Sequence, residues 1–127
     1  MHLFLVGNGV PHLILECSDN IAEKNPQLLN ILHDCQQILV ENLPTNLETC
    51  KSRLIRHQDY LLGNGEVTNA FVHLEVRVLV GRSVGLLTEL AKRLKAHILS
   101  QLSESQCSNL KLKISVEIIE LSNIYVN

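Results

Sequence analysis

The sequence predicts an α/β fold, of the α+β type, in which tandem β-α-β repeats form a four-stranded sheet covered on one face by two helices. Apolar residues recur at strand spacing in four segments and at helical spacing in two. The order of these segments is strand, helix, strand, repeated once. No long Pro-, Gly- or Ser-rich linker separates the repeats, so we expect them to share one core. Right-handed crossovers place both helices on the same face.

The first repeat begins with a strand at residues 11–17, whose apolar face carries Leu13, Leu15 and Cys17. Turn residues at 18–20 end this strand. Asn25 and Pro26 predict a helix start, because Asn is a good N-cap and Pro fits the first helical position. The helix carries an apolar stripe made of Leu28, Ile31, Leu32, Cys35, Ile38 and Leu39. A second strand is predicted at 49–61.

The second repeat follows a turn at residues 63–65 and begins with an alternating strand at 70–78. Gly-Arg-Ser at 81–83 forms a tight turn, with Ser83 as the N-cap of the next helix. The apolar stripe of that helix is Leu87, Leu90, Ala91, Leu94, Ile98 and Leu102. Polar residues at 103–109 separate it from a last strand, whose apolar face carries Leu110, Leu112, Ile114, Val116 and Ile118.

Composition indicates a globular domain and argues against several kinds of partner. Hydrophobic residues make up 46% of the chain and aromatic residues only 3%, so the core must be aliphatic. The formal net charge is -2 and no basic stripe is present, so we expect no nucleic-acid partner. No apolar run is long enough to span a bilayer, and residues 1–10 lack the features of a signal peptide. We therefore expect no membrane partner and a cytoplasmic location.

The cysteines and histidines do not form a metal-binding pattern. The chain has 4 Cys and 6 His, which are scattered and include no C-x-x-C pair. The sequence therefore predicts neither a metal site nor a cofactor. The cysteines are Cys17, Cys35, Cys50 and Cys107. In a cytoplasmic protein we expect them to be buried small hydrophobic residues rather than a disulfide framework.

Two patterns could bind an anion. Lys51 and Arg53 lie two positions apart in a strand, so both side chains project from one face and could bind a carboxylate. Arg82 precedes a helix N-terminus, where unpaired N–H groups favour anions. Each pattern also has an ordinary explanation, as solvated charges on a strand or as a capped helix start. Pro11 is unremarkable by pattern, because Pro is tolerated at the first residue of a strand.

A family resemblance distinguishes between these readings. The segment at 11–20, Pro-His-Leu-Ile-Leu-Glu-Cys-Ser-Asp-Asn, resembles the amino-terminal strand of the 5-carboxymethyl-2-hydroxymuconate isomerases of the tautomerase superfamily. Ala-Phe-Val-His-Leu at 70–74 and Gly-Arg-Ser at 81–83 match that family in order and spacing. Lys51 and Arg53 fall where the family has a basic pair. The first block is the most specific part of the resemblance.

The resemblance implies a tautomerase or MIF-like fold assembled as a homotrimer, with sites built from neighbouring subunits. It implies a 1,3-proton shift that converts a dienol bearing carboxylates into its conjugated keto isomer during aromatic acid degradation. The base in that family is the proline of the mature amino terminus. Carried over, Pro11 would move the proton, while Arg82 and the face with Lys51 and Arg53 would bind the carboxylates of this small molecule and the developing enolate.

Residues 1–10 precede the predicted tautomerase-like domain at residues 11–127. As numbered, the nitrogen of Pro11 belongs to an amide and has no lone pair for a base. Bacterial genes can start at a valine codon read as methionine, so we expect initiation at Val10, and residues 1–10 would be an artefact of gene-start assignment. The alternative is a genuine extension on an inactive relative that serves as a binding or structural trimer. Such an extension is apolar enough to pack against the sheet, with residues 7–9 as a bend.

Overall fold

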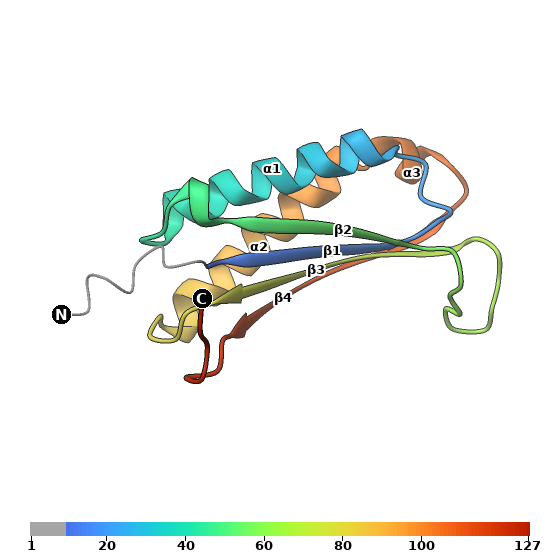
Figure 1. Cartoon of the computed structure of the whole chain (residues 1–127). Helices are drawn as coiled ribbons and strands as arrows, with labels where there is room; N and C mark the ends of the chain where they lie inside the picture. Colours follow the sequence, from blue (N-terminus) through green and yellow to red (C-terminus); the bar gives the residue numbers. More distant parts are fainter. Residues whose placement is uncertain (1–9) are drawn as a thin grey trace.

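The predicted four-stranded sheet is present in the computed structural model, which describes residues 10–127 (Figure 1). Its strand order is β2-β1-β3-β4. β1 (His12–Ser18) pairs in parallel with β2 (Lys51–His57), and β3 (Asn69–Val78) pairs in parallel with β4 (Lys111–Glu120). β1 and β3 are antiparallel neighbours at the centre of the sheet. The expected packing of residues 1–9 lies outside the described part of the chain.

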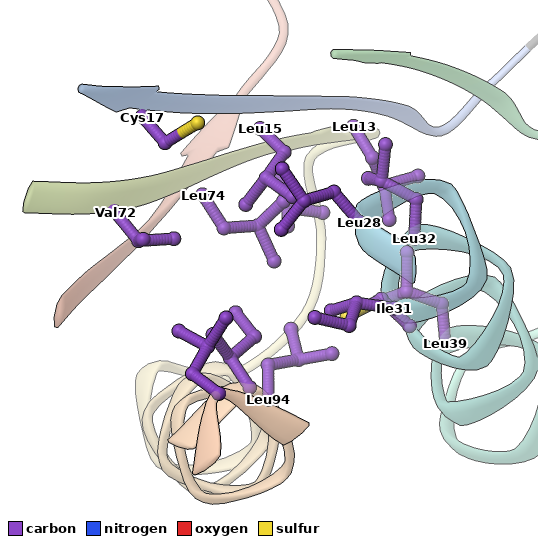
Figure 2. Packing of buried hydrophobic residues seen from close by; sticks show 14 of the residues in the cluster. Leu13, Leu15, Cys17, Leu28, Ile31, Leu32, Leu39, Val72, Leu74 and Leu94 are labelled. Atoms are coloured by element: carbon purple, nitrogen blue, oxygen red, sulfur yellow. The ribbon is translucent and has the colours of Figure 1, made fainter. Parts of the chain in front are cut away.

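Two long helices cover one face of this sheet, as predicted (Figure 1). α1 (Asn25–Asn42) connects β1 to β2, and α2 (Val84–Gln101) connects β3 to β4. Figure 2 shows apolar side chains of the central strands β1 and β3 and of both helices, which meet between the two layers. Burial follows the predicted alternation and stripes, with the largest fully buried aliphatic side chains being Leu13, Leu15, Leu28, Leu32, Leu39, Leu74, Leu90, Leu94, Ile98 and Leu102.

The start of α1 differs by one residue from the prediction. Lys24, not Asn25, is the N-cap, and Pro26 occupies the second helical position. The Gln27 side chain reaches back to the Lys24 N–H group at 2.7 Å, which completes the cap without Asn25. The Asn25 side-chain oxygen instead accepts a hydrogen bond from Arg56 of β2 at 3.2 Å. A tertiary contact therefore replaced the local capping role that the sequence indicated.

Two other boundaries also differ from the prediction. β2 is shorter than residues 49–61, because a single 3-10 turn, η2 (Leu47–Thr49), precedes it and an exposed loop follows it. The polar stretch after α2 contains a short helix, α3 (Ser103–Cys107). Ser105 of this helix is buried, and its N–H group and hydroxyl both donate to the Glu23 carboxylate. This polar contact ordered a segment whose composition predicted a break.

The cysteine prediction is confirmed for half of the set. Cys17 and Cys35 are buried in the core, whereas Cys50 is half-buried and Cys107 is exposed. Burial raises the pKa of the Cys35 thiol to about 12, so this thiol stays protonated and packs as an apolar group. All four are free thiols in the structure.

The face of the sheet opposite the helices carries both apolar and charged side chains. Ile14, Ile55 and Phe71 lie on it, as the strand alternation predicts, and Ile55 is 42% exposed. Charged neighbours stand between them, including a His57–Glu16 pair at 2.8 Å. Among residues 10–127, no helix covers this face, which leaves the exposed Ile55 available to another subunit, whereas Ile14 is already buried among its neighbours.

Candidate active site

A pocket lies where β1 begins and β3 ends. His12 at the start of β1 pairs with Arg77 near the end of antiparallel β3, which places Pro11 beside the chain that leaves β3. The Gly-Arg-Ser turn follows directly and brings Arg82 to the same place. The pocket is small and partly open, with a cavity volume of about 10 Å³, and it is lined by Val10, Pro11, Leu43, Pro44, Thr45, Val78, Leu79 and Arg82. The sequence-predicted residues Pro11 and Arg82 therefore share one pocket.

Arg82 is held by the turn that starts α2. Gly81 has φ of +113°, a left-handed conformation that glycine adopts without strain. Ser83 caps α2, as predicted, because its hydroxyl accepts the Leu86 N–H group at 3.1 Å. The Arg82 guanidinium donates to the Leu79 carbonyl at 3.2 Å and is paired with no carboxylate of residues 10–127. A half-buried guanidinium with this environment suits an anionic ligand.

Pro11 is buried at the end of the sheet where the central strand β1 begins, and its carbonyl accepts the Lys51 N–H group at 3.1 Å. Val10 forms part of the pocket wall beside it and is only 3% exposed. The Val10 carbonyl accepts hydrogen bonds from the hydroxyls of Thr45 at 3.0 Å and Thr49 at 2.9 Å. In the chain as numbered, the residue before Pro11 is thus buried in the pocket wall and hydrogen-bonded there.

Lys51 and Arg53 lie at the same end of the sheet as Pro11 but on its uncovered face. They alternate with Ser52, whose hydroxyl bonds Gln36 of α1 on the helix side. Both cations are exposed, and Lys51 is registered opposite His12. Within one chain, the structure brings Pro11 and Arg82 together, whereas this basic pair belongs to a neighbouring surface.

His12 links this basic pair to the C-terminal segment. The Arg53 guanidinium lies 2.9 Å from His12 Nδ1, and the Tyr125 hydroxyl lies 2.7 Å from His12 Nε2. A guanidinium can only donate, so Nδ1 must be the acceptor, and a neutral ring then carries its proton on Nε2 and donates it to Tyr125. Burial, and then the charges of Arg53, Lys51 and Arg77, lower the pKa of His12 below its ordinary value. The surface therefore holds a neutral imidazole among cations.

Comparison with known families decides the assignment. The family profile of 5-carboxymethyl-2-hydroxymuconate isomerase matches residues 11–126. The chain belongs to this isomerase family. A crystal structure of a 5-carboxymethyl-2-hydroxymuconate isomerase from Deinococcus radiodurans R1 is 27% identical, with a TM-score of 0.83 over 97% of this chain and 92% of that one. A comparison with curated proteins found no match.

Two more distant structures share the fold of this family member. A 5-carboxymethyl-2-hydroxymuconate delta-isomerase is 15% identical, with a TM-score of 0.78 over 98% of this chain and 90% of that one. A fused 4-OT symmetric trimer is 16% identical, with a TM-score of 0.66 over 91% of this chain and 90% of that one. The tautomerase fold predicted from the sequence is confirmed by these likenesses and by the sheet topology. Family membership identifies the chain as an isomerase of the tautomerase type.

We expect a pH-dependent change at His12 of this isomerase-family chain. The folded state lowers the His12 pKa below its ordinary value of about 6.5. The stability that comes from the neutral ring is therefore present above about pH 6.5 and is lost as the pH falls through the lower, folded-state pKa. NMR titration of the imidazole protons should give a midpoint below 6.5. The midpoint should rise in Arg53→Ala but stay depressed, because burial is the larger cause. A wild-type midpoint at or above 6.5 would contradict the arrangement.

Sequence reasoning missed three polar groups around the site of this isomerase-family chain. Thr45 and Thr49 follow α1 in a segment with no recognisable motif. Tyr125 lies beyond the last strand, 113 positions from the histidine that it contacts. A threonine or a tyrosine in a loop carries no periodic signal, so only the folded structure could place these hydroxyls near Pro11.

Across residues 10–127, no three side chains of His, Cys, Asp or Glu are grouped so that they could hold a metal ion. Among the same residues, no helix is long and apolar enough to cross a membrane.

Proposed function

We propose that this protein catalyses a 1,3-proton shift, from enol to conjugated keto form, on a carboxylate-bearing muconate-type acid in aromatic acid degradation. Pro11, as an amino-terminal residue, is the general base. The observation that carries the proposal is that Pro11 and Arg82 line the same pocket. A proton shift next to a carboxylate needs a base and a fixed cation, and neither role calls for a metal or a cofactor.

Pro11 suits the role of base once its nitrogen is free. An α-amino group titrates near pH 8 as a rough reference value. Burial and a nearby guanidinium both disfavour the protonated amine, which shifts its pKa toward neutrality, where a general base is most effective. Pro11 is buried and Arg82 lines its pocket, so both influences are available. The five-membered ring also fixes the direction of the lone pair.

The basic residues divide the binding of the substrate. Arg82 holds one carboxylate next to the base, through charge-assisted hydrogen bonds. Lys51 and Arg53 face away from their own helices and toward the surface where a second subunit would lie. We assign to them the second carboxylate and the developing enolate, in a site shared between subunits. This division explains why one chain does not bring all four predicted residues into one pocket.

The active form is proposed to begin at Pro11, with residues 1–10 an artefact of gene-start assignment. The family match begins at the same residue, which supports the proposal. Mass spectrometry of the protein from its native source reads the true amino terminus. A mass that includes residues 1–10 would overturn this form and favour the second candidate.

The second candidate is an inactive homotrimer that binds ligands or has a structural role. It is favoured by one observation, the burial of Val10 in the pocket with its carbonyl held by two threonine hydroxyls. In that form Pro11 remains an amide and Val10 remains part of the pocket wall. A native protein that retains residues 1–10 and has no tautomerase activity would support this candidate over the enzyme.

We expect the protein to assemble as a homotrimer, in the cytoplasm. One fold relative is described as a symmetric trimer, and the uncovered sheet face here carries Ile14, Ile55 and Phe71 among charged residues. Subunits that meet through these faces would bury the apolar side chains and bring the basic pair to a neighbouring pocket. Multi-angle light scattering at micromolar concentration should give three times the chain mass of 14.3 kDa. A stable monomer would refute both the buried face and the shared site.

A further inference from the structure

We infer that the Thr45 hydroxyl is a substrate-positioning group, which donates a hydrogen bond to an oxygen of the substrate beside Pro11. This inference rests on the proposed function, in which Pro11 is the amino-terminal base. Its starting point is the pocket itself, where Thr45 is a lining residue together with Pro11 and Arg82. Neither the sequence motifs nor the family match draws attention to this threonine.

The Val10 carbonyl marks where such an oxygen would sit. It accepts the Thr45 hydroxyl at 3.0 Å in a buried position. The carbonyl oxygen and the Pro11 nitrogen are bonded to the same carbon, so they lie only about 2.2 Å apart. When Pro11 is the first residue, this oxygen is absent and its place is open. The Thr45 hydroxyl then points to a position next to the free nitrogen.

Thr45 depends on an incoming acceptor more than its neighbour Thr49 does. The Thr49 hydroxyl lies 2.9 Å from the Val10 carbonyl and also 2.9 Å from the Asn46 carbonyl. A hydroxyl has one proton, so without Val10 it can donate to Asn46. Among residues 10–127, Thr45 has no second acceptor for its hydroxyl. A half-buried donor without an acceptor favours a ligand that supplies one.

The position of the Thr45 hydroxyl is fixed by its surroundings. Leu43 is buried at the end of α1, and the Thr45 N–H group donates to its carbonyl at 2.8 Å. Pro44 between them restricts the backbone further. The Thr45 hydroxyl is therefore a donor in a fixed position. Together with Arg82 it offers a neutral and a charged donor to one ligand. This combination suits a carboxylate or an enolate oxygen of the substrate.

The test uses the chain that begins at Pro11 and compares Thr45→Val, which keeps the shape, with Thr45→Ser, which keeps the hydroxyl. We expect Thr45→Val to lower kcat/KM for a muconate-type dienol by about tenfold or more. Thr45→Ser should stay close to the parent. Thr49→Val is the matched control and should have a smaller effect, because its hydroxyl has the Asn46 carbonyl as an alternative. Thermal unfolding checks that each variant is folded, and Thr45→Ala replaces the valine variant if that one is unstable.

Binding of adipate, an unreactive dicarboxylate, distinguishes the two kinds of oxygen. Weaker binding in Thr45→Val assigns the hydroxyl to a carboxylate, whereas a loss in kcat with unchanged binding assigns it to the enolate. Equal effects of the valine and serine variants, or of Thr45→Val and Thr49→Val, would overturn the inference. An inactive parent chain would overturn the proposed function instead, and adipate binding would still test Thr45.

Discussion

A chain that begins at Pro11 should isomerise a muconate-type enol about 10²- to 10⁴-fold faster than the 127-residue chain, the range that a positioned general base contributes. Two physical changes are both expected to raise the rate of the shorter chain. Removal of residues 1–10 turns the Pro11 amide into a secondary amine with a lone pair. It also removes Val10, which is only 3% exposed and forms part of the pocket wall beside that amine, and so opens the pocket. Stopped-flow absorbance of enol loss and keto gain measures the difference.

The matched control is Pro11→Ala in the shorter chain. This variant keeps a free amino terminus but exchanges the ring amine for a primary amine, and we expect it to lose most of the gain. The pH profile of kcat/KM should show one group near neutrality that must be deprotonated. Equal rates for the long and short chains would refute Pro11 as the base, whatever the rate of the alanine variant.

Replacement of Arg82 by Ala in the shorter chain should lower kcat/KM by roughly 10- to 100-fold, because a hydrogen bond to a charged group contributes about 1.5–3 kcal/mol. Arg82 lines the pocket and is paired with no carboxylate of residues 10–127. Its loss therefore removes a ligand contact without breaking an internal ion pair. Steady-state kinetics with a dicarboxylate and a monocarboxylate enol show which carboxylate it binds.

Two further variants serve as comparisons for Arg82→Ala. Arg82→Lys keeps the charge but loses the bidentate fork, so we expect an intermediate loss. Lys95→Ala removes an exposed cation from α2, away from the pocket, and should leave the kinetics unchanged. An Arg82→Ala enzyme with parental kinetics would return this arginine to the role of a turn residue. The same would follow if Arg82→Ala only lowered the thermal stability.

Much of this fold could be predicted because its signals are local and repeated. The buried alternation of Leu13, Leu15 and Cys17 placed β1, and the Ser83 cap placed the start of α2. The errors arose where a distant residue competed with a local preference. Asn25 bonds Arg56 instead of capping α1, and Ser105 bonds a buried Glu23 in a segment that looked like a break. Sequence patterns do not contain such partners.

Some residues of the candidate site could likewise be predicted from the sequence, and others could not. A family resemblance pointed to Pro11 and Arg82, and the structure places both at one pocket. It also pointed to Lys51 and Arg53, whose side chains lie on the other face of the sheet within a single chain. The hydroxyls of Thr45 and Tyr125 had no signal of their own, because their importance depends on which atoms the fold brings near them. Short-range patterns therefore predicted the framework, and the family resemblance pointed to the charged groups, but neither pointed to the neutral donors.

The antiparallel pairing of β1 with β3 gives the chain the internal organisation of a covalently joined dimer. Each half has a parallel strand pair and one long helix, and the buried side chains of both halves form one shared core. Within residues 10–127, the only ladder between the halves is the β1–β3 pairing. The loop from residue 58 to 68 joins the halves at the end of the sheet away from Pro11 (Figure 1). A break in that exposed loop would leave every strand ladder whole. Two such fragments would depend on each other to fold, and they would rebuild the pocket where the first half supplies Pro11 and the second supplies Arg82.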